Sequence, residues 1–376
     1  MGGWKTVPNP LKPDRYFWLG DEACAEGAIA AGCNFYAGYP ITPSSEIMER
    51  IAHRFSEIES RVFIQMEDEL ASIAACIGAA WAGAKAMTAT SGPGLSLMLE
   101  NIGYAIITET PLVIIDVQRA GPSTGQATRP AQGDMMQARW GAHGDYEVIA
   151  LSPWSVTEMY TETIRAFNLA ERFRVPVLIL ADEAVGHLRE GVKIDKEVRV
   201  YERKKGRGVA PFVGRDVPPM PAFGEGEKLL ITGSTHDQWG FRRTVSPEAQ
   251  KNLVRHLARK ITDHKGEIIE VVEYHCQDEK LDLLLIAYGF TARSALAAVE
   301  GAREKGLKAG LLRLKTIWPF PQEELLRVGQ KAKRVIVPEM NLGQIVREVQ
   351  RVLPQAEPYS RTDGQVITPQ EIVSAF

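Results

Sequence analysis

The sequence predicts a doubly wound α/β domain followed by a second, smaller α/β unit. At 376 residues the chain is too long for one compact core, so two domains are expected. Strand-like and helix-like segments alternate from Asp21 to about Asp182, and again from Leu281 to Val352. The strand-like runs are continuously apolar instead of alternating with polar residues, which is typical of a parallel sheet covered by helices on both faces.

In the first unit, apolar runs alternate with segments of helical periodicity. The expected strands are 34–39, 61–66, 85–90, 112–118, 147–151 and 175–181. The expected helices are 22–32, 44–58, 70–83, 95–108, 132–140 and 155–173. This order predicts parallel strands joined by helical crossovers.

The second half of the chain opens with a change of composition. Residues 190–246 are rich in proline, glycine and charge, and they predict a linker or irregular arm, followed by a helix over 247–265. Strands are then expected at 281–288, 309–314 and 334–338, and helices at 292–305, 322–330 and 344–352. The predicted boundaries are 1–190 for the first domain, 191–262 for the arm with its connecting helix, and 263–376 for the last domain.

Composition excludes several classes of function. Charged residues make up 24% of the chain, hydrophobic ones 45%, and the net charge is −3, so we expect an ordinary globular protein with no nucleic-acid face. No apolar run approaches the roughly 18 residues that span a bilayer, so no membrane segment is expected. The four cysteines form neither a disulfide framework nor a ligand set, which favours a reducing cytoplasm and no iron–sulfur cluster in this chain. The histidines are not at metal-ligand spacing either, so no metal site is expected.

The segment from Gly38 to Glu46 has the clearest local chemistry. It follows an apolar strand-like run and opens an amphipathic helix, with Thr42 as a suitable N-cap and Pro43 at the first helical position. The free N–H groups of such a helix end suit an anion, for example a substrate carboxylate. The alternative is a well-capped surface helix without a binding role.

Glu69 follows two other acids at the start of an Ala/Gly-rich helix. That helix has almost no polar face, so it should be buried, and a carboxylate at its edge should have a raised pKa suited to proton exchange. The alternative is that the three acids only complement the helix dipole.

Arg119 follows the predicted strand 112–118, where its guanidinium could clamp a carboxylate through two parallel hydrogen bonds. The alternative is a structural ion pair with Asp116 or Asp134. The turn 91–94 permits a close approach of the backbone. No phosphate loop, nucleophile elbow or dinucleotide fingerprint is present in a suitable context.

These motifs together resemble the alpha subunit of the 2-oxoacid:ferredoxin oxidoreductases, most nearly the branch that uses 2-oxoglutarate. The matching stretches are 39–45, 66–71, 88–94, 116–125, 130–134, 138–145, 318–321 and 338–344. They are independent of one another and cover most of the chain.

The resemblance implies a thiamine diphosphate enzyme that decarboxylates 2-oxoglutarate, reduces ferredoxin and forms succinyl-CoA from coenzyme A. This chain would supply a pyrimidine-binding domain and a transketolase-C-like domain. A separate beta subunit would hold the diphosphate, Mg²⁺ and a [4Fe–4S] cluster, and the chain lacks the Gly-Asp-Gly signature and clustered cysteines for these groups. It should therefore be inactive alone. The resemblance leaves open whether gamma and delta subunits complete the assembly.

The resemblance also implies roles for single residues. Glu69 matches the glutamate that hydrogen-bonds the aminopyrimidine ring of the cofactor and sets its tautomer. Tyr39 and Pro40 would line that ring.

Three further residues match positions that receive the substrate. Thr42 and Arg119 match the residues that bind the 2-oxoacid carboxylate, and Thr128 matches another polar residue of the same loop. A distal carboxylate would need a further contact, for which Arg129 and Arg139 are candidates. Pyruvate or a branched-chain oxoacid remains an alternative substrate, and a non-catalytic scaffold or a self-contained transketolase-like enzyme remains an alternative class.

Overall fold

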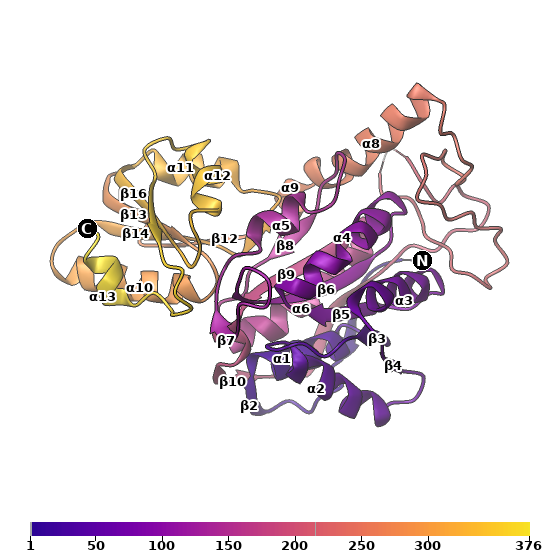
Figure 1. Ribbon diagram of the computed structural model, residues 1–376, viewed down its shortest axis with the longest axis horizontal. Coiled ribbons are helices and arrows are strands. Elements are labelled where there is room, and N and C mark those ends of the chain that lie inside the picture. The colour runs from indigo at the N-terminus through magenta and orange to yellow at the C-terminus, as the bar shows by residue number, and fades with distance from the viewer. Residues whose placement is uncertain (1, 215) are drawn as a thin grey trace.

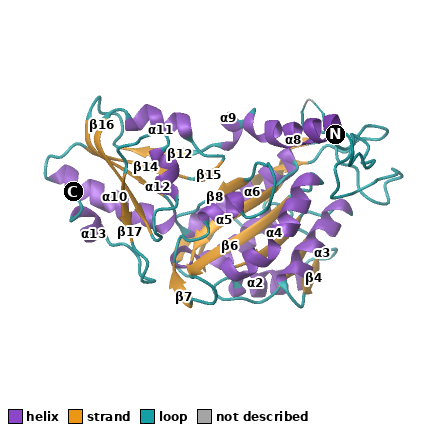
Figure 2. Ribbon diagram, turned by 45° about the horizontal axis from the view of Figure 1, so that its top comes forward, coloured by secondary structure: helices purple, strands orange, loops and turns teal. Residues whose placement is uncertain are grey.

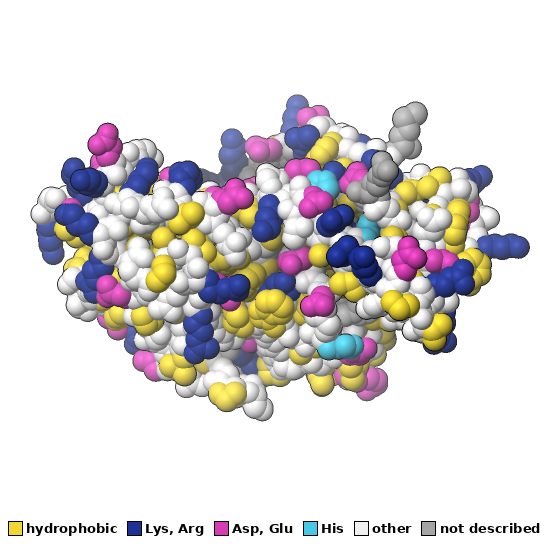
Figure 3. All heavy atoms as spheres, turned by 90° about the horizontal axis from the view of Figure 1, so that it is seen from above, with side chains coloured by type: hydrophobic (Ala, Val, Ile, Leu, Met, Phe, Trp, Pro, Cys, Tyr) yellow, Lys and Arg dark blue, Asp and Glu magenta, His cyan; other side chains and the backbone are white. Residues whose placement is uncertain are grey.

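The computed structural model describes residues 2–214 and 216–376 of the chain. Two α/β units lie side by side, and the long helix α8 (Pro247–Thr262) runs along the top of Figure 1. Acidic and basic side chains are interspersed on the face seen in Figure 3. None of the described helices combines the length and apolar character needed to cross a membrane.

The first unit is built on a mainly parallel sheet, seen in Figure 2. Its order is β15 (Thr316–Trp318), β8 (Ile149–Leu151), β9 (Pro176–Asp182), β6 (Leu112–Ala120), β5 (Ala86–Thr90), β3 (Phe35–Gly38) and β4 (Val62–Gln65). β7 (Gln126–Pro130) folds back antiparallel on β6. The doubly wound α/β fold predicted from the sequence is confirmed.

Helices cover both faces of this sheet. α1 (Gly20–Ala30) packs against α2 (Ser45–Ser56) and α6 (Val156–Phe173), and α3 (Glu69–Trp81) packs against α4 (Gly92–Ile107). The chain moves outward from β3 to β4 and then back past β3 to β5, so its right-handed crossovers place α2 and α3 on opposite faces. The junction between β3 and β5 is therefore a topological switch point, where ligands of such folds bind.

Burial follows the position of each strand in the sheet. Every residue of β6 and β9 is buried, which explains the unbroken apolar runs 112–115 and 177–181 within them; the polar residues of β6 follow its apolar run, towards the carboxyl end of the strand. β4 is an edge strand, and its Val62 and Ile64 are 44% and 38% exposed.

The prediction of an irregular arm from residue 190 is wrong for its first residues, which form strands. Two strands, β10 (Arg189–Lys193) and β11 (Glu197–Glu202), form antiparallel ribbons with β2 (Arg15–Leu19) and β1 (Gly3–Pro8) near the N-terminus. These short ribbons depend on partners almost the whole domain away, so local periodicity does not reveal them. From 203 to 246 the described residues form no helix or strand.

A buried cluster of charges holds the arm and α8 to the first domain. Arg174 donates from Nη1 to the carbonyl of Pro211 at 2.5 Å and from Nε to that of Glu109 at 3.1 Å. The Glu109 carboxylate in turn contacts His256 at 2.9 Å and Lys260 at 3.2 Å. The buried carboxylate is thus paired and hydrogen-bonded, as such a charge requires.

The last unit has its own sheet, with the order β12 (Val271–Tyr274), β14 (Ala309–Leu314), β13 (Leu281–Ala287), β16 (Ala332–Glu339) and β17 (Glu357–Ser360). The helices around it are α10 (Gly289–Glu304), α11 (Gln322–Gly329), α12 (Ile345–Gln350) and α13 (Pro369–Val373). The predicted elements are present, and the sequence missed only the edge strands and the short helices.

Gln132 joins the two units through a fully satisfied polar network. Its Nε2 donates to Asp182 Oδ2 at 3.2 Å and to the Tyr288 carbonyl at 3.1 Å. Its Oε1 accepts from the Met340 backbone and the Thr291 hydroxyl, both at 3.1 Å. Strand β15 adds a second link, because it leaves the last unit to pair with β8. These links fix the second unit against the carboxyl ends of the first sheet.

Candidate active site

The candidate site lies at the switch point, where the loops after β3, β5 and β6 leave the sheet. These loops begin at Tyr39, Ser91 and Gly121. The first of them carries Tyr39, Pro40 and Thr42, whereas Glu69 begins α3 and Arg119 lies at the end of β6.

The loop after β3 corrects the predicted start of the next helix. α2 begins at Ser45 with Ser44 in the N-cap position, so Thr42 is not the cap and Pro43 is not the first helical residue. The Ser44 hydroxyl and backbone N–H both donate to the Ile41 carbonyl at 2.9 Å. This turn places Thr42 before the helix, so a ligand at Thr42 would meet loop backbone instead of the helix end.

Arg119 joins this loop to the end of β6. Its Nη1 donates to the Thr42 carbonyl at 2.6 Å, and the side chain is 9% exposed. Its Nε is buried without a hydrogen-bond partner among the described residues. The alternative ion pair with Asp116 or Asp134 is not formed in the described part of the chain, and both Asp116 carboxylate oxygens lack partners there. Arg119 therefore keeps a buried donor free for an acceptor such as a carboxylate.

Asp68 and Glu69, at the start of α3, have different roles. Asp68 is the N-cap, and its carboxylate accepts from the Ala71 backbone at 2.7 Å. Glu69 is the first helical residue and is 4% exposed. Burial raises the pKa of Glu69, and the nearby charge of Asp68 adds to the shift. Helix capping thus belongs to Asp68, which leaves the Glu69 carboxyl free for another role.

The turn after β5 lies directly against Glu69. A Cβ added at Gly94 would overlap the Glu69 carboxylate and the Thr90 hydroxyl. A Cβ at Gly92 would lie 3.0 Å from Asp134 Oδ2. The glycines of this turn are therefore required because two carboxylates approach its backbone.

Asp116 and Asp134 form a buried carboxyl pair beside the turn. Burial raises the pKa of Asp134 to about 6, and burial with the neighbouring Asp134 charge raises the pKa of Asp116 well above its ordinary value. The sequence pointed to these acids only as partners for Arg119. Their own pairing depends on the approach of the loop 130–134 to β6, which no local pattern shows.

A cavity of about 470 Å³ opens between the two units at this point. From the first unit it is lined by Arg119, Pro93 and Asp134, and from the second by Asn341 and Arg361, among others. Sequence motifs had marked the stretch 338–344, but the contribution of Arg361 was not expected.

Not every predicted residue joins this group. Thr128 is exposed on β7 and is not among the residues that line the cavity. Arg139 is buried and occupied, since it donates to the Tyr146 carbonyl at 2.8 Å and to Glu147 at 3.0 Å. Arg139 is therefore a poor candidate for a distal substrate carboxylate, whereas Arg129 is exposed.

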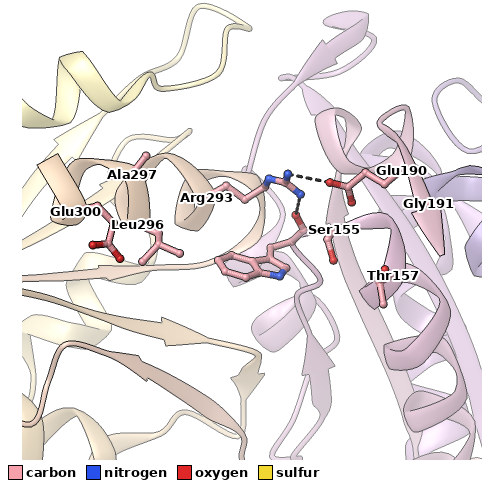
Figure 4. A pocket seen from close by; sticks show the side chains of 9 residues that line it. Ser155, Thr157, Glu190, Gly191, Arg293, Leu296, Ala297 and Glu300 are labelled. Carbon is pink, nitrogen blue, oxygen red and sulfur yellow. Dashed lines mark hydrogen bonds and ion pairs between the residues drawn. The ribbon is translucent and has the colours of Figure 1, made fainter. Parts of the chain in front are cut away.

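A larger cavity, about 630 Å³, lies elsewhere between the units (Figure 4). There Arg293 of α10 donates to Glu190 at 2.8 Å and to the Trp154 carbonyl at 3.2 Å. Glu190 also accepts from the Val156 backbone at 3.0 Å. These partnered groups fix α10 to the first domain. We therefore interpret this cavity as part of the interface between the two units and not as a binding site.

The predicted burial of α3 holds for one face only. Its other face exposes Leu70, at 43%, together with Ala74 and Gly78. Val62 and Ile64 of the edge strand β4 are exposed as well, and we call these apolar residues together the β4–α3 surface.

Comparison with known proteins identifies relatives over nearly the whole chain. Residues 26–256 match the family model for the pyruvate flavodoxin/ferredoxin oxidoreductase, thiamine diphosphate-binding domain, and residues 282–372 match pyruvate:ferredoxin oxidoreductase core domain II. The chain is 52% identical to 2-oxoglutarate synthase subunit KorA of Methanocaldococcus jannaschii, over 96% of this chain and 98% of the relative. It is 36% identical to ketoisovalerate oxidoreductase subunit VorB of Methanothermobacter marburgensis, over 94% and 95%.

A solved structure is similar in both sequence and fold. It is the 2-oxoglutarate:ferredoxin oxidoreductase from Magnetococcus marinus with 2-oxoglutarate, coenzyme A and succinyl-CoA bound, at a TM-score of 0.92 and 32% identity. The match covers 96% of this chain and 65% of the solved chain, which is therefore considerably longer.

Proposed function

Because the chain belongs to the pyruvate flavodoxin/ferredoxin oxidoreductase family, we propose that it is the alpha subunit of a 2-oxoglutarate:ferredoxin oxidoreductase. In the reaction 2-oxoglutarate loses carbon dioxide, two electrons pass to ferredoxin, and the succinyl group is transferred to coenzyme A. The family membership confirms the resemblance drawn from the motifs. The proposal includes a beta subunit with the diphosphate site and cluster, and a cytoplasmic location, which the four free, buried cysteines support.

One observation carries the proposal. At the switch point, the buried Glu69 carboxyl begins α3, and Arg119, whose Nε–H has no partner among the described residues, lies at the end of β6 and lines the cavity. A proton-exchanging acid and a carboxylate clamp are the two groups that a 2-oxoacid decarboxylase needs from this domain.

The Glu69 environment fits the aminopyrimidine of thiamine diphosphate. When bound, thiamine diphosphate supplies the stabilised carbanion chemistry that releases the carboxyl group of a 2-oxoacid. Glu69 would hold or donate a proton at its carboxyl, and its desolvated position favours the protonated form. Tyr39 is 40% exposed and Pro40 is also exposed, so both are free to line a ring.

The substrate carboxylate fits the Arg119 end of the site. The Thr42 carbonyl holds Nη1 and so orients the guanidinium, while Nε remains available. A charge-assisted hydrogen bond from a buried guanidinium is stronger than a neutral one. The Thr42 hydroxyl would add a second contact, and Thr128 would have to act from the exposed β7 hairpin.

The β4–α3 surface supports the proposed beta subunit. An apolar edge strand beside an apolar helix face is costly to leave in water and prone to pair with another chain. A beta subunit seated there would cover the surface and would bring its diphosphate site to the side of Glu69. The chain alone would then hold only half of the cofactor site.

Anaerobic turnover of the purified native complex tests the proposal. We would follow ferredoxin or methyl viologen reduction with coenzyme A and offer 2-oxoglutarate, pyruvate and 2-oxoisovalerate in parallel. Reduction with 2-oxoglutarate alone is the expected result. Preference for another oxoacid would overturn the assignment of 2-oxoglutarate as the substrate. No reduction with any of them, despite bound cofactor and intact clusters, would favour a non-catalytic scaffold role for the chain.

A further inference from the structure

Three ionisable side chains converge away from the proposed active site. They are Asp21 in the first turn of α1, Glu46 in the first turn of α2, and His187 at the end of the short helix α7 (Glu183–Gly186). One ligand atom from each lies within 4.8 Å of the other two.

Asp21 is the unusual member of this group. Its side chain is 0% exposed, and neither carboxylate oxygen has a hydrogen-bond partner among the described residues. A Cβ added at Gly186 would lie 2.8 Å from Asp21 Oδ1, so the glycine provides the space for the carboxylate. A buried carboxylate without any partner is strongly unfavourable, which points to a missing positive charge.

The acids around Asp21 make a further positive charge more favourable still. Besides His187, the charges that act on it are the carboxylates of Glu46, Glu183 and Glu22, and these raise the pKa of Asp21 beyond the effect of burial. Glu22 lies 3.7 Å from Arg189, so His187 is left to balance Asp21, Glu46 and Glu183.

His187 is oriented as a metal ligand would be. Its Nδ1 lies 3.3 Å from Glu183 Oε1, and its Nε2 lies 3.5 Å from Glu46 Oε2 without forming a hydrogen bond to any described residue. A carboxylate that holds one imidazole nitrogen while the other faces a cation is the usual outer-shell arrangement of metal sites.

We propose that Asp21, Glu46 and His187 bind a divalent transition-metal cation, with Glu183 orienting the histidine. One imidazole nitrogen and two carboxylate oxygens suit Mn²⁺ or Zn²⁺ and disfavour Ca²⁺, which takes oxygen ligands. Ligands on opposite sides of a cation at about 2.1 Å are about 4.2 Å apart, so a small inward movement of the side chains suffices. Glu46 and His187 are partly exposed and leave an entry path to the buried Asp21.

The cation would join three helices of the first domain. Because Glu46 is the second residue of α2, directly after the loop that carries Thr42, the metal would tie the start of α2 to α1 and α7. The site would therefore stabilise the loop that positions Arg119, without contacting substrate.

Mn²⁺ binding to the full chain tests this site without any need for activity. We would strip the purified chain with EDTA, desalt it, titrate Mn²⁺ by electron paramagnetic resonance, and displace the bound Mn²⁺ with Zn²⁺. The expected result is one Mn²⁺ per chain. Glu46→Gln and His187→Gln should abolish this binding, and Glu183→Gln should weaken it by about 10–100-fold. Glu49→Gln, an exposed acid on the same helix, should bind Mn²⁺ normally.

A second measurement tests the buried ligand, Asp21. The unfolding temperature of the wild-type chain should rise with Mn²⁺, whereas that of Asp21→Asn should not respond. Absence of stoichiometric Mn²⁺ or Zn²⁺ binding, or binding that survives both Glu46→Gln and His187→Gln, would overturn the proposal. The cluster would then be a group of carboxyls and a histidine that share protons.

Discussion

Replacing Gly94 by alanine would test whether the packing of Glu69 against α4 is needed for activity. Gly94 lies in the first turn of α4, where alanine by itself should favour the helix by roughly 0.5–1 kcal/mol. The added Cβ, however, would lie 2.7 Å from Glu69 Cδ and closer still to its Oε1.

The size of the effect follows from that distance. Nonbonded carbons prefer separations of about 3.5–4.0 Å, so the Glu69 carboxyl must move by about 1 Å. Overpacking of this kind costs roughly 1–3 kcal/mol of folding stability, part of which the helix preference offsets. A displacement of about 1 Å in a catalytic group can lower turnover by about 10²-fold. We therefore expect Gly94→Ala to lose kcat by about 10²-fold while it remains folded and assembled.

The assay is anaerobic reduction of ferredoxin by the intact complex with 2-oxoglutarate and coenzyme A. Gly301→Ala is the matched control, because Gly301 lies in the helix α10 and an added Cβ there meets nothing within 4 Å. The double variant Glu69→Ala/Gly94→Ala should be little slower than Glu69→Ala, since the displaced carboxyl is then absent and the added Cβ overlaps only the Thr90 hydroxyl. Turnover of Gly94→Ala within a factor of three of wild type, or losses that multiply in the double variant, would refute the reasoning.

Three further predictions concern ionisable groups of the site. Glu69→Gln keeps the shape of the side chain but removes its acid, so turnover of the assembled complex should fall by roughly 10²–10⁴; near-normal turnover would rule out the assigned role. Arg119→Lys should raise KM for the oxoacid, because an ammonium cannot both hold the Thr42 carbonyl and reproduce the guanidinium fork, and unchanged KM and kcat would exclude the clamp. Burial holds the pKa of Asp116 well above its ordinary 3.8, so folding stability should be lost as pH rises above that value. Asp116→Asn should therefore gain stability over wild type by up to about 1.4 kcal/mol per pH unit above pH 4, measured by urea unfolding at pH 4 and pH 7, and a gain independent of pH would show that another group titrates.

Local sequence was sufficient for the central elements of the fold. Residues 112–115 of β6 and 177–181 of β9 are continuously apolar because helices cover both faces of the sheet, and this pattern marks both strands without any knowledge of their neighbours. The N-terminus of α2 was harder to predict, because Thr42, Ser44 and Ser45 are all residue types that favour the N-cap position. The turn that Ser44 makes with Ile41 decides between them, and it depends on how the loop lies on the sheet.

The sequence by itself determined the chemical types at the site and the strands that carry them. The acid at Glu69, the cation at Arg119 and the glycines of the turn 91–94 are all readable, because strand ends and helix starts have local signals. It could not say that Asp68 would cap α3 and leave Glu69 free, or that Arg139 would be occupied by Tyr146 and Glu147.

Only the tertiary structure decided which of these residues meet. Arg119 reaches the Thr42 carbonyl across 77 residues of sequence because β3, β5 and β6 are neighbours in the sheet. The same sheet order brings Gly94 against Glu69, and the packing of α1 against α2 brings Asp21 near Glu46. Periodicity records how each segment is buried, but it holds no information on the order of the strands or the packing of the helices, and these set the contacts.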